Sequence, residues 1–455
     1  MKRKLAHPGR SALLTGAAVL LLVAACGAEG GAGVGEDGGG ETDGGPDGGA
    51  PDAGGDDGGT PPRCGDFPAS CAGVEPTAIT EHRMVALEAC AFGLVRSGDP
   101  AAARAIFDEI APLAGGYRPL SELLQNLNRA ALSGVTADTA DRLQNHPYLG
   151  FRWNAGDMAT TDWYPQGITG GSDRQADGRP EGRRLILVSW YDHTGNTPAK
   201  GVRVSLVDLT DPADVTYRHL LLVEPRREGG AATFGPVVTG SGGALHAGGM
   251  VWIGDLLLVA DTGNGFRVFD LSLTLQTTHT DDKTRIGVSA GRVDGHGYRY
   301  VVPQVARYVM PAEACDVRFS FAGLDRSASP PVIVSGEYHS GDVLGRLVSW
   351  PVDLATGWLQ EEADGVVRGQ AAVVGAQTRM QGGLSWAGNY YLSCSSQTAS
   401  GYGRLYRTRP GLTSSISAWP YGAEDLYYER DVNRIWTAAE HPDARDTVSI
   451  LRLDP

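Results

Sequence analysis

The 455-residue sequence lacks the short motifs that identify most enzyme classes. It has no C-x-x-C pair, so neither a zinc site of the usual spacing nor a thioredoxin-like redox site is indicated. It has no Walker A pattern and no H-E-x-x-H, and residues 287–291 match G-x-S-x-G without the strand and helix of a nucleophile elbow. Lysine and arginine number 39 against 53 acidic residues, with no basic stripe, so we expect no nucleic-acid partner.

The first 25 residues have the order of a secretory signal peptide. Basic residues near the N-terminus precede an apolar run that ends in small residues. The following segment, Val23-Ala24-Ala25-Cys26, resembles the lipobox at which bacterial lipoproteins are cleaved and acylated. The resemblance implies an exported chain that begins at Cys26 and is held in a membrane by acyl chains, each buried CH₂ contributing about 0.8 kcal/mol. The alternative is an ordinary signal peptide followed by a chance cysteine.

Gly27 bears on which membrane holds the anchor. It lies where an aspartate would retain a lipoprotein in the inner membrane. We therefore expect the outer membrane if the host has two membranes.

Residues 26–62 form a spacer after the lipidated cysteine. The stretch from Gly27 to Pro62 contains nine acidic residues and no basic one, which accounts for most of the formal net charge of −14. A segment with so little to bury cannot offset the entropy of ordering its backbone, so the sequence predicts a disordered linker.

Five further cysteines follow the spacer. An exported chain keeps disulfides, and an odd count leaves at least one thiol. Cys64–Cys90 and Cys71–Cys90 are the two pairings that would fasten the segment before the helices. The predicted strand positions put Cys315 and Cys394 at opposite ends of their units, so no disulfide is expected between them.

Residues 63–148 predict a small helical region. The apolar residues of 85–95, 101–113 and 120–132 are spaced as on the buried faces of helices. Asp99 suits the N-cap of the second helix, and Pro100 suits its first position. We expect this region to be a helical cap on the domain that follows.

Residues 149–455 predict a β-propeller. Short β-rich runs bounded by Gly, Asp, Asn and Pro replace the helical pattern, and a three-strand pattern recurs. Units of this size cannot bury their own faces, whereas packing around an axis buries them. The predicted fold is therefore mainly β: a five- or six-bladed β-propeller preceded by a small α-helical segment, with any sixth unit within residues 287–325.

The same region resembles secreted bacterial β-propeller proteins of uncharacterised function. The segments that carry the resemblance are Asp162-Trp163-Tyr164-Pro165-Gln166-Gly167, His246-Ala247-Gly248-Gly249-Met250-Val251-Trp252, Met380-Gln381-Gly382 and Glu424-Asp425-Leu426. The resemblance covers the blades and not the helical region. It implies the fold and brings no activity with it.

Propeller geometry predicts that polar residues of the repeat gather at one end of a central channel. The first strand of each blade runs along the channel and the second returns antiparallel, so the start of one and the end of the other share a face. The first strands begin at Gln166, His246, Gln304, Gln381 and Glu424. The second strands end at Asp192-His193, Asp261, Glu337 with His339, and Glu440-His441.

These residues can bind a polar ligand or a metal, or act as general acid and base. Glu424 and His246 are the first candidates for metal ligands. The alternative is a wet channel whose lining is polar for that reason alone.

Three functions remain open, the third of which makes the helical region a docking module for a partner with the propeller as a rigid base. The first is a membrane-anchored, surface or periplasmic propeller that binds a polar small molecule, glycan or protein at its channel face. The second is a metal-dependent hydrolase of lactonase or esterase type, with calcium held by the acids and histidine at the channel mouth. The second rests on analogy between folds, so whether the chain is an enzyme is undecided at this point.

Overall fold

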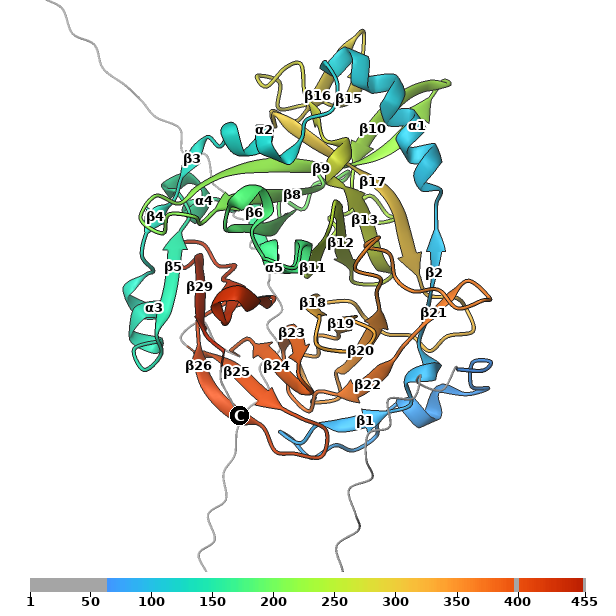
Figure 1. The fold of residues 1–455 in the computed structure, drawn as a ribbon, viewed down its shortest axis with the longest axis vertical. Coiled ribbons are helices and arrows are strands. Elements are labelled where there is room, and N and C mark those ends of the chain that lie inside the picture. The colour runs from blue at the N-terminus through green and yellow to red at the C-terminus, as the bar shows by residue number, and fades with distance from the viewer. Residues whose placement is uncertain (1–63, 397–400, 453–455) are drawn as a thin grey trace, which may run out of the picture. The chain divides into compact units, whose positions relative to one another are not determined.

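The computed structural model describes residues 64–396 and 401–452, which belong to one compact unit spanning residues 61–455. The predicted signal peptide, Cys26 and the spacer lie outside the described residues. In the part of the chain that the structure describes, no helix is both long and apolar enough to cross a membrane. The fold is mainly β (Figure 1).

Five groups of antiparallel strands make up most of the unit. The first contains β6 (Trp163–Gly170), β7 (Leu185–Asp192), β8 (Val202–Asp208) and β9 (Thr216–Glu228). The second contains β11 (Met250–Ile253), β12 (Leu256–Asp261), β13 (Gly265–Asp270) and β17 (Tyr300–Val309). The third contains β18 (Phe321–Asp325), β19 (Val332–Gly336), β20 (Arg346–Pro351) and β22 (Ala371–Val374). The fourth contains β23 (Met380–Trp386), β24 (Asn389–Cys394), β25 (Gly403–Thr408) and β26 (Ser415–Trp419). The fifth contains β27 (Tyr427–Glu429), β28 (Arg434–Ala438), β29 (Asp446–Leu451) and β5 (Tyr148–Arg152).

Shorter strands extend these groups. They are β1 (Val85–Leu87) on β22, β2 (Gly93–Ser97) between β17 and β21 (Val366–Arg368), β3 (Arg129–Ala130) and β10 (Ala231–Pro236) on β9, β4 (Leu132–Ser133) on β5, β14 (Leu275–Gln276) on β17, and the hairpin β15 (Ile286–Ser289) with β16 (Arg292–Gly295).

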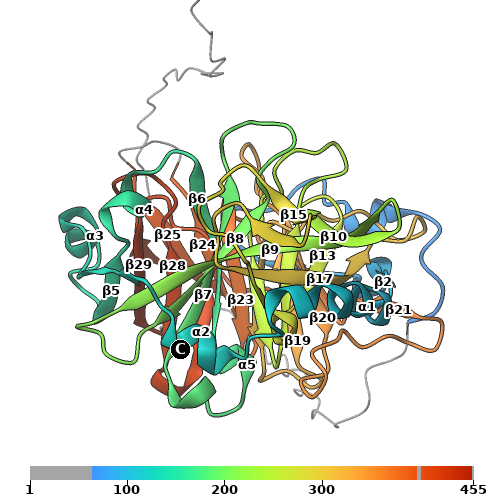
Figure 2. The same ribbon diagram turned by 90° about the horizontal axis from the view of Figure 1, so that it is seen from above.

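The helices are short. The α-helices are α1 (Pro100–Ile110), α2 (Leu120–Gln125), α3 (Ala137–Arg142), α4 (Ala155–Ala159) and α5 (Gly171–Arg174). The 3₁₀-helices are η1 (Cys71–Val74), η2 (Ala89–Ala91), η3 (Ala111–Ala114), η4 (Pro180–Gly182), η5 (Leu271–Leu273) and η6 (Arg430–Val432). The longest, α1, lies against β9, β10 and β17 on the outer side of the first two groups (Figure 2).

The first two groups join into one sheet. β9 and β17 pair in parallel over residues 221–223 and 301–303. Along the eight-strand path β11-β12-β13-β17-β9-β8-β7-β6, the end strands return to each other, because the Trp252 N–H of β11 donates to Thr169 Oγ1 of β6 at 3.1 Å. The sheet is therefore a nearly closed, barrel-like ring.

The first strands of the five groups pack against one another around one axis, and we call β6, β11, β18, β23 and β27 the inner strands. Asp425, at the start of the fifth group, is fully buried on this axis. Its carboxylate accepts hydrogen bonds from the backbone N–H groups of Ile168, Met250 and Ala322, at 3.2, 3.3 and 3.3 Å. One side chain therefore ties three other inner strands to the fifth group.

The inner strands approach each other too closely for side chains. A Cβ atom on Gly249 would collide with the backbone of Phe321 and Ala322 in the next inner strand. A Cβ atom on Gly382 would lie 2.6 Å from the carbonyl oxygen of Glu424. Glycine at these two positions lets backbone fill the axis, so at the level of Asp425 the predicted wet channel is replaced by packed strands.

The prediction of helix over residues 85–95 is wrong. Val85–Leu87 and Gly93–Ser97 are strands β1 and β2, which pair with strands of the second and third groups. Short apolar runs fit both periods, and pairing at these sheet edges satisfies the backbone better than an isolated helix would.

The second predicted helix is present, and the third is short. Asp99 Oδ1 accepts the Ala101 N–H at 2.9 Å at the start of α1, and Pro100 occupies its first turn. Residues 129–133, also predicted helical, form β3 and β4 instead.

Residues 63–148 do not form a separate helical domain. Strand β5 begins at Tyr148 and pairs with β29, so it completes the fifth group from a position about 300 residues earlier in the chain. The predicted boundary between residues 148 and 149 therefore falls within strand β5. The early segment is part of the same fold, since it contributes edge strands to the sheets that the later repeats form.

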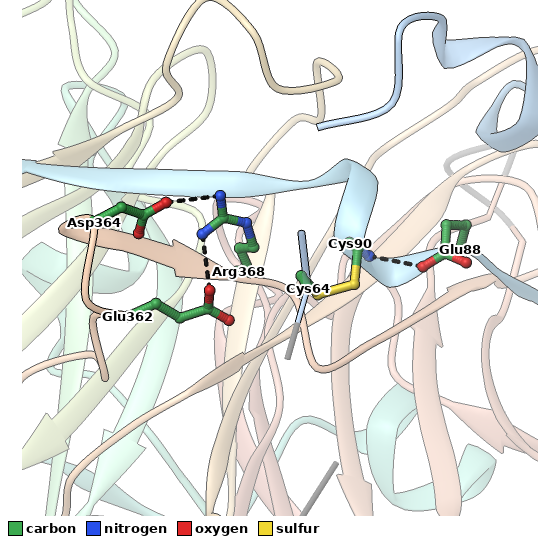
Figure 3. Close-up of a disulfide and its surroundings, with 6 residues drawn as sticks. All are labelled: Cys64, Glu88, Cys90, Glu362, Asp364 and Arg368. Carbon is green, nitrogen blue, oxygen red and sulfur yellow. Dashed lines mark hydrogen bonds and ion pairs between the residues drawn. A yellow bond between two sulfur atoms is a disulfide. The ribbon is translucent and has the colours of Figure 1, made fainter. Parts of the chain in front are cut away.

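Two disulfides fasten the segment that precedes α1. Cys64–Cys90 is one of the two predicted pairings, and Cys71 pairs with Cys315, which was not among them. Beside the first disulfide, Arg368 of β21 bridges Glu362 and Asp364 at 2.9 and 2.8 Å (Figure 3). Cys394 is a buried free thiol, so the prediction of no Cys315–Cys394 disulfide is confirmed.

The prediction that Gln304 begins an inner strand is also wrong. Gln304 lies in β17, the outermost strand of the second group, and the inner strand of the third group is β18. The intervening residues form the β15–β16 hairpin, which interrupts the repeat and shifts its spacing. Residues 287–325 contribute to this hairpin, to β17 and to β18, and the described residues contain no sixth group there.

We predict that Asp425→Ala lowers the free energy of unfolding by at least about 3 kcal/mol, since three buried N–H groups would each lose an acceptor at about 1–3 kcal/mol. Asp425→Asn keeps one acceptor oxygen and should lose less. Urea denaturation measures both, with exposed Asp316→Ala as the control. An unchanged midpoint for Asp425→Ala would show that the carboxylate does not hold the inner strands.

Candidate functional site

Polar side chains from four of the five groups meet at the end of the axis where the inner strands begin. We call this set the axial cluster; it consists of Gln166, Tyr191, His246, Gln381, Glu424 and Glu440. Because each second strand returns to this end, side chains from both strands of a group reach it.

Bulges present the two glutamines of the cluster. The pairing of β6 with β7 shifts register between Pro165 and Ile168, and that of β23 with β24 shifts between Met380 and Gly382. Gln166 and Gln381 each lie in such a shift, each followed by glycine. A bulge re-aims a side chain relative to the regular pleat, and both amides turn toward the fifth group.

Each glutamine donates to one glutamate of the fifth group. Gln166 Nε2 donates to Glu440 Oε2 at 2.9 Å, and Gln381 Nε2 donates to Glu424 Oε1 at 3.0 Å. Burial raises the pKa of Glu424 well above its usual value, and repulsion from Glu440 and Asp425 adds to this. Burial also raises the pKa of Glu440, against the opposing effects of Gln166 and Arg445.

His246 lies at the end of a strained turn before β11. Ala247 has φ of +55°, a conformation that costs an L-residue on the order of 1 kcal/mol and is found at functional sites. Ser189 Oγ holds the turn by donating to the Ala247 carbonyl at 2.7 Å. The His246 ring lies 4.6 Å from that of Tyr191.

Protein surrounds His246 on several sides, yet solvent reaches it. Desolvation by the surrounding protein, together with a contribution from His193, lowers the pKa of His246 to about 4. The imidazole is therefore neutral at physiological pH. Because the residue is nevertheless exposed, it borders open solvent at the end of the axis.

Four of the eight predicted site residues come together in the cluster: Gln166, His246, Gln381 and Glu424. The other four serve their own loops and sheets. Asp192 accepts the backbone N–H groups of Thr194 and Lys200 at 3.1 and 2.6 Å and so shapes the loop after β7.

Asp261, Gln304 and Glu337 are occupied by buried arginine contacts. Arg267 donates to Asp261 at 2.7 Å and to Gln304 at 3.2 Å, which links the two within the second group. Arg346 donates twice to Glu337 at 2.9 Å. The carboxylates of Asp261 and Glu337 are therefore already paired with arginine side chains.

The prediction of a metal site at Glu424 and His246 finds no ligand set. Within residues 64–396 and 401–452, no group of three or more His, Cys, Asp or Glu side chains is placed to hold a metal ion. We therefore derive no function from a metal.

Sequence reasoning missed Asp425 and Tyr191. Asp425 is adjacent to Glu424, but only the folded structure shows that three other strands donate to it. Tyr191 directly precedes Asp192 at the end of β7. The alternation of side chains between the two faces of that strand was the sequence signal that could have identified it.

A buried Ser-His-Asp chain occurs in the first group. Ser205 Oγ lies 2.9 Å from His219 Nδ1, and His219 Nε2 lies 3.0 Å from Asp157 Oδ2. All three residues are at most 4% exposed, and Trp190 Nε1 donates to Ser205 Oγ at 2.8 Å. Trp350 and Ser335 repeat that contact at 2.8 Å in the third group without a histidine. The chain is therefore a structural network.

A hollow of about 350 Å³ lies between the third and fourth groups at the opposite end of the strands. Its acidic residue, Asp325, accepts bonds from Ser327 N–H at 2.7 Å and Ser385 Oγ at 2.6 Å. Since local partners use this carboxylate, the axial cluster is the better candidate site.

Comparisons with known proteins assign no family. No protein-family model matches the chain, and no curated protein matches it. Among solved structures, hydrazine synthase of Kuenenia stuttgartiensis is similar at 12% sequence identity and a TM-score of 0.26, over 60% of this chain and 73% of that one. A likeness this weak supports no argument about function.

We predict that Glu424→Gln changes how stability depends on pH. The raised pKa of Glu424 means that the folded state keeps a proton that the unfolded state releases above its usual value of 4.5. Wild-type stability is therefore fully present below that value and is lost as pH rises through the folded pKa, by up to about 1.4 kcal/mol per pH unit. Denaturation from about pH 5 to pH 7 should show a smaller loss for Glu424→Gln than for wild type. Exposed Glu313→Gln is the control, and parallel curves for Glu424→Gln and wild type would contradict the assignment.

Proposed function

We propose that this chain is a five-bladed β-propeller that binds a small polar ligand at the axial cluster. The observation that carries the proposal is the convergence of amide, carboxyl, phenol and imidazole groups from four strand groups at one solvent-reachable end of the axis.

The propeller assignment is supported by the strand connections. Each of the five groups has four antiparallel strands in succession, and the first of each lies at the axis. The last group takes its fourth strand, β5, from the start of the repeat region. Closing a ring of blades with a strand from the other end of the chain removes a free sheet edge.

The binding assignment is supported by a hydrogen-bond acceptor of the cluster that has no partner within the cluster. Gln166 is 1% exposed, yet its Oε1 atom has no hydrogen-bond partner among the described residues. A buried acceptor without a donor costs about 1–3 kcal/mol. With the strained turn at Ala247, this unmet acceptor favours a ligand over a purely structural cluster.

We also propose that the chain is exported and anchored through lipid on Cys26, at the outer membrane if the host has two. The sequence at Val23-Ala24-Ala25-Cys26 suggests it. The Cys64–Cys90 and Cys71–Cys315 disulfides add support, because disulfides persist in oxidising compartments.

Cys26→Ser tests the anchor. The wild-type chain should partition into detergent and incorporate labelled palmitate, whereas Cys26→Ser should do neither. Gly27→Ala leaves the cysteine in place and serves as the matched control. Equal membrane retention of Cys26→Ser and wild type would contradict lipidation.

Thermal shift with a panel of sugars, polyols, amino acids, amines and carboxylates tests binding. At a concentration of about 100 Kd a ligand stabilises by about 2.7 kcal/mol, which corresponds to a shift of a few degrees. We expect at least one class to stabilise wild type and the His279→Ala control but not His246→Ala. If no class stabilises, or if the shift survives in His246→Ala, the axial cluster is not the binding site.

A further inference from the structure

The axial cluster contains acidic groups without a matching cation. In the described residues, neither Glu424 nor Glu440 forms an ion pair with a lysine or arginine side chain, and each is met by a neutral amide instead. The nearest imidazole, His441, lies 3.7 Å from Glu440, and burial lowers its pKa, so it adds little charge. Asp425, directly below, adds a third carboxyl group.

The nearby arginine is only partly used by backbone: Arg445 Nε and Nη1 donate to backbone carbonyls, whereas its buried Nη2 has no hydrogen-bond partner among the described residues. Arg445 donates to the backbone carbonyls of Glu440, Asp157 and Thr160 at 2.8, 2.9 and 2.7 Å. Its guanidinium also lies 4.8 Å from the Tyr164 ring centroid. It moderates the field at Glu440 without satisfying either carboxyl group.

Aromatic rings surround the same end of the axis. Tyr191 lies against His246 at 4.6 Å, Tyr164 against His193 at 4.0 Å, and Tyr421 against His441 at 4.5 Å. Aromatic rings beside carboxylates attract organic cations, through the negative face of the ring and through direct charge pairing.

The unpaired acceptor of Gln166 limits which kinds of cation could bind in the cluster. Gln166 Oε1 requires an N–H or O–H donor, which a quaternary ammonium lacks. For a metal ion, the described residues place no group of three or more His, Cys, Asp or Glu side chains as ligands. An anion would be repelled whenever Glu424 or Glu440 is ionised.

We propose that the ligand of the axial cluster is a small primary ammonium compound whose charged nitrogen pairs with Glu424 and Glu440. This inference rests on the proposed binding function of the cluster and specifies its chemistry. The ammonium supplies N–H donors for the carboxylates and for Gln166, and its carbon chain lies beside the Tyr191 and His246 rings.

Binding of this class is linked to protons. Burial and mutual repulsion raise the pKa of both glutamates, and an ammonium would lower it again. Binding therefore releases protons, and affinity rises with pH while the amine keeps its charge. The titratable groups that interact with the glutamates are Asp425, Tyr191, Tyr421, His441 and Arg445. His246, in the same cluster, stays neutral because its pKa is about 4.

The test uses the mature chain from Cys26 onward, labelled on its nine histidines, with the His246 signals assigned by His246→Ala. The probes are n-butylamine, 1-butanol and butyrate, which share a chain and differ in the head group. We expect n-butylamine alone to shift the His246 signals, with an affinity at least about tenfold higher near pH 8 than near pH 5. Glu424→Gln and Glu440→Gln should each weaken it by about tenfold or more, and Glu313→Gln should not.

The outcomes separate this inference from the proposal beneath it. If a sugar or polyol of the panel shifts the His246 signals and n-butylamine does not, the cluster binds ligands but not amines. If n-butylamine binds equally to wild type and both glutamate variants, the cation lies elsewhere and the inference is overturned. If no compound of either set moves the His246 signals, the proposed binding function fails as well.

Discussion

The buried carboxylate of Asp425 accepts three backbone N–H groups from inner strands that are far apart in sequence, and the centre of the fold depends on this contact. Burial raises the pKa of Asp425 well above its usual value, while the donated N–H groups oppose that rise. Those strands can come within reach only because Gly249 and Gly382 carry no side chain into the axis. The axial cluster lies at one end of this packed centre, where Gln166 and Glu424 are buried and His246 is exposed to solvent.

The early segment of the chain completes this arrangement from outside. Strands β1 and β2 lie on the edges of the third and second groups, and β5 closes the fifth. The Cys71–Cys315 disulfide spans 244 residues and ties the segment to the loop before β18. A cross-link over so long a loop removes much conformational freedom from the unfolded chain. In the proposed anchored protein, it would also fasten the point at which the spacer meets the fold.

The sequence predicted the repeat well because polar residues and glycine recur where inner strands begin. Of the residues predicted at the channel face, Gln381 donates to Glu424, Gln166 donates to Glu440, and His246 lies against Tyr191. Gln304 was misplaced because the β15–β16 hairpin interrupts the spacing of the second unit. Asp261 and Glu337 stand at the predicted strand ends, but Arg267 and Arg346 lie on adjacent strands, and spacing alone does not reveal cross-strand pairing. Residues 85–95 fit a helical pattern in sequence because their strand partners lie more than 200 residues later.

The axial cluster links the fold to the proposed function. Glu424 accepts a hydrogen bond from the neutral Gln381 amide, and among the described residues no lysine or arginine side chain forms an ion pair with it. Amide hydrogen exchange at Ile168, Met250 and Ala322 tests the central claim most directly. The account predicts that these three amides exchange only through global unfolding, with protection equal to the highest in the protein and lost together in Asp425→Ala. Exchange of any of the three by local opening, at the rate of surface loops, would contradict a structure held together at Asp425.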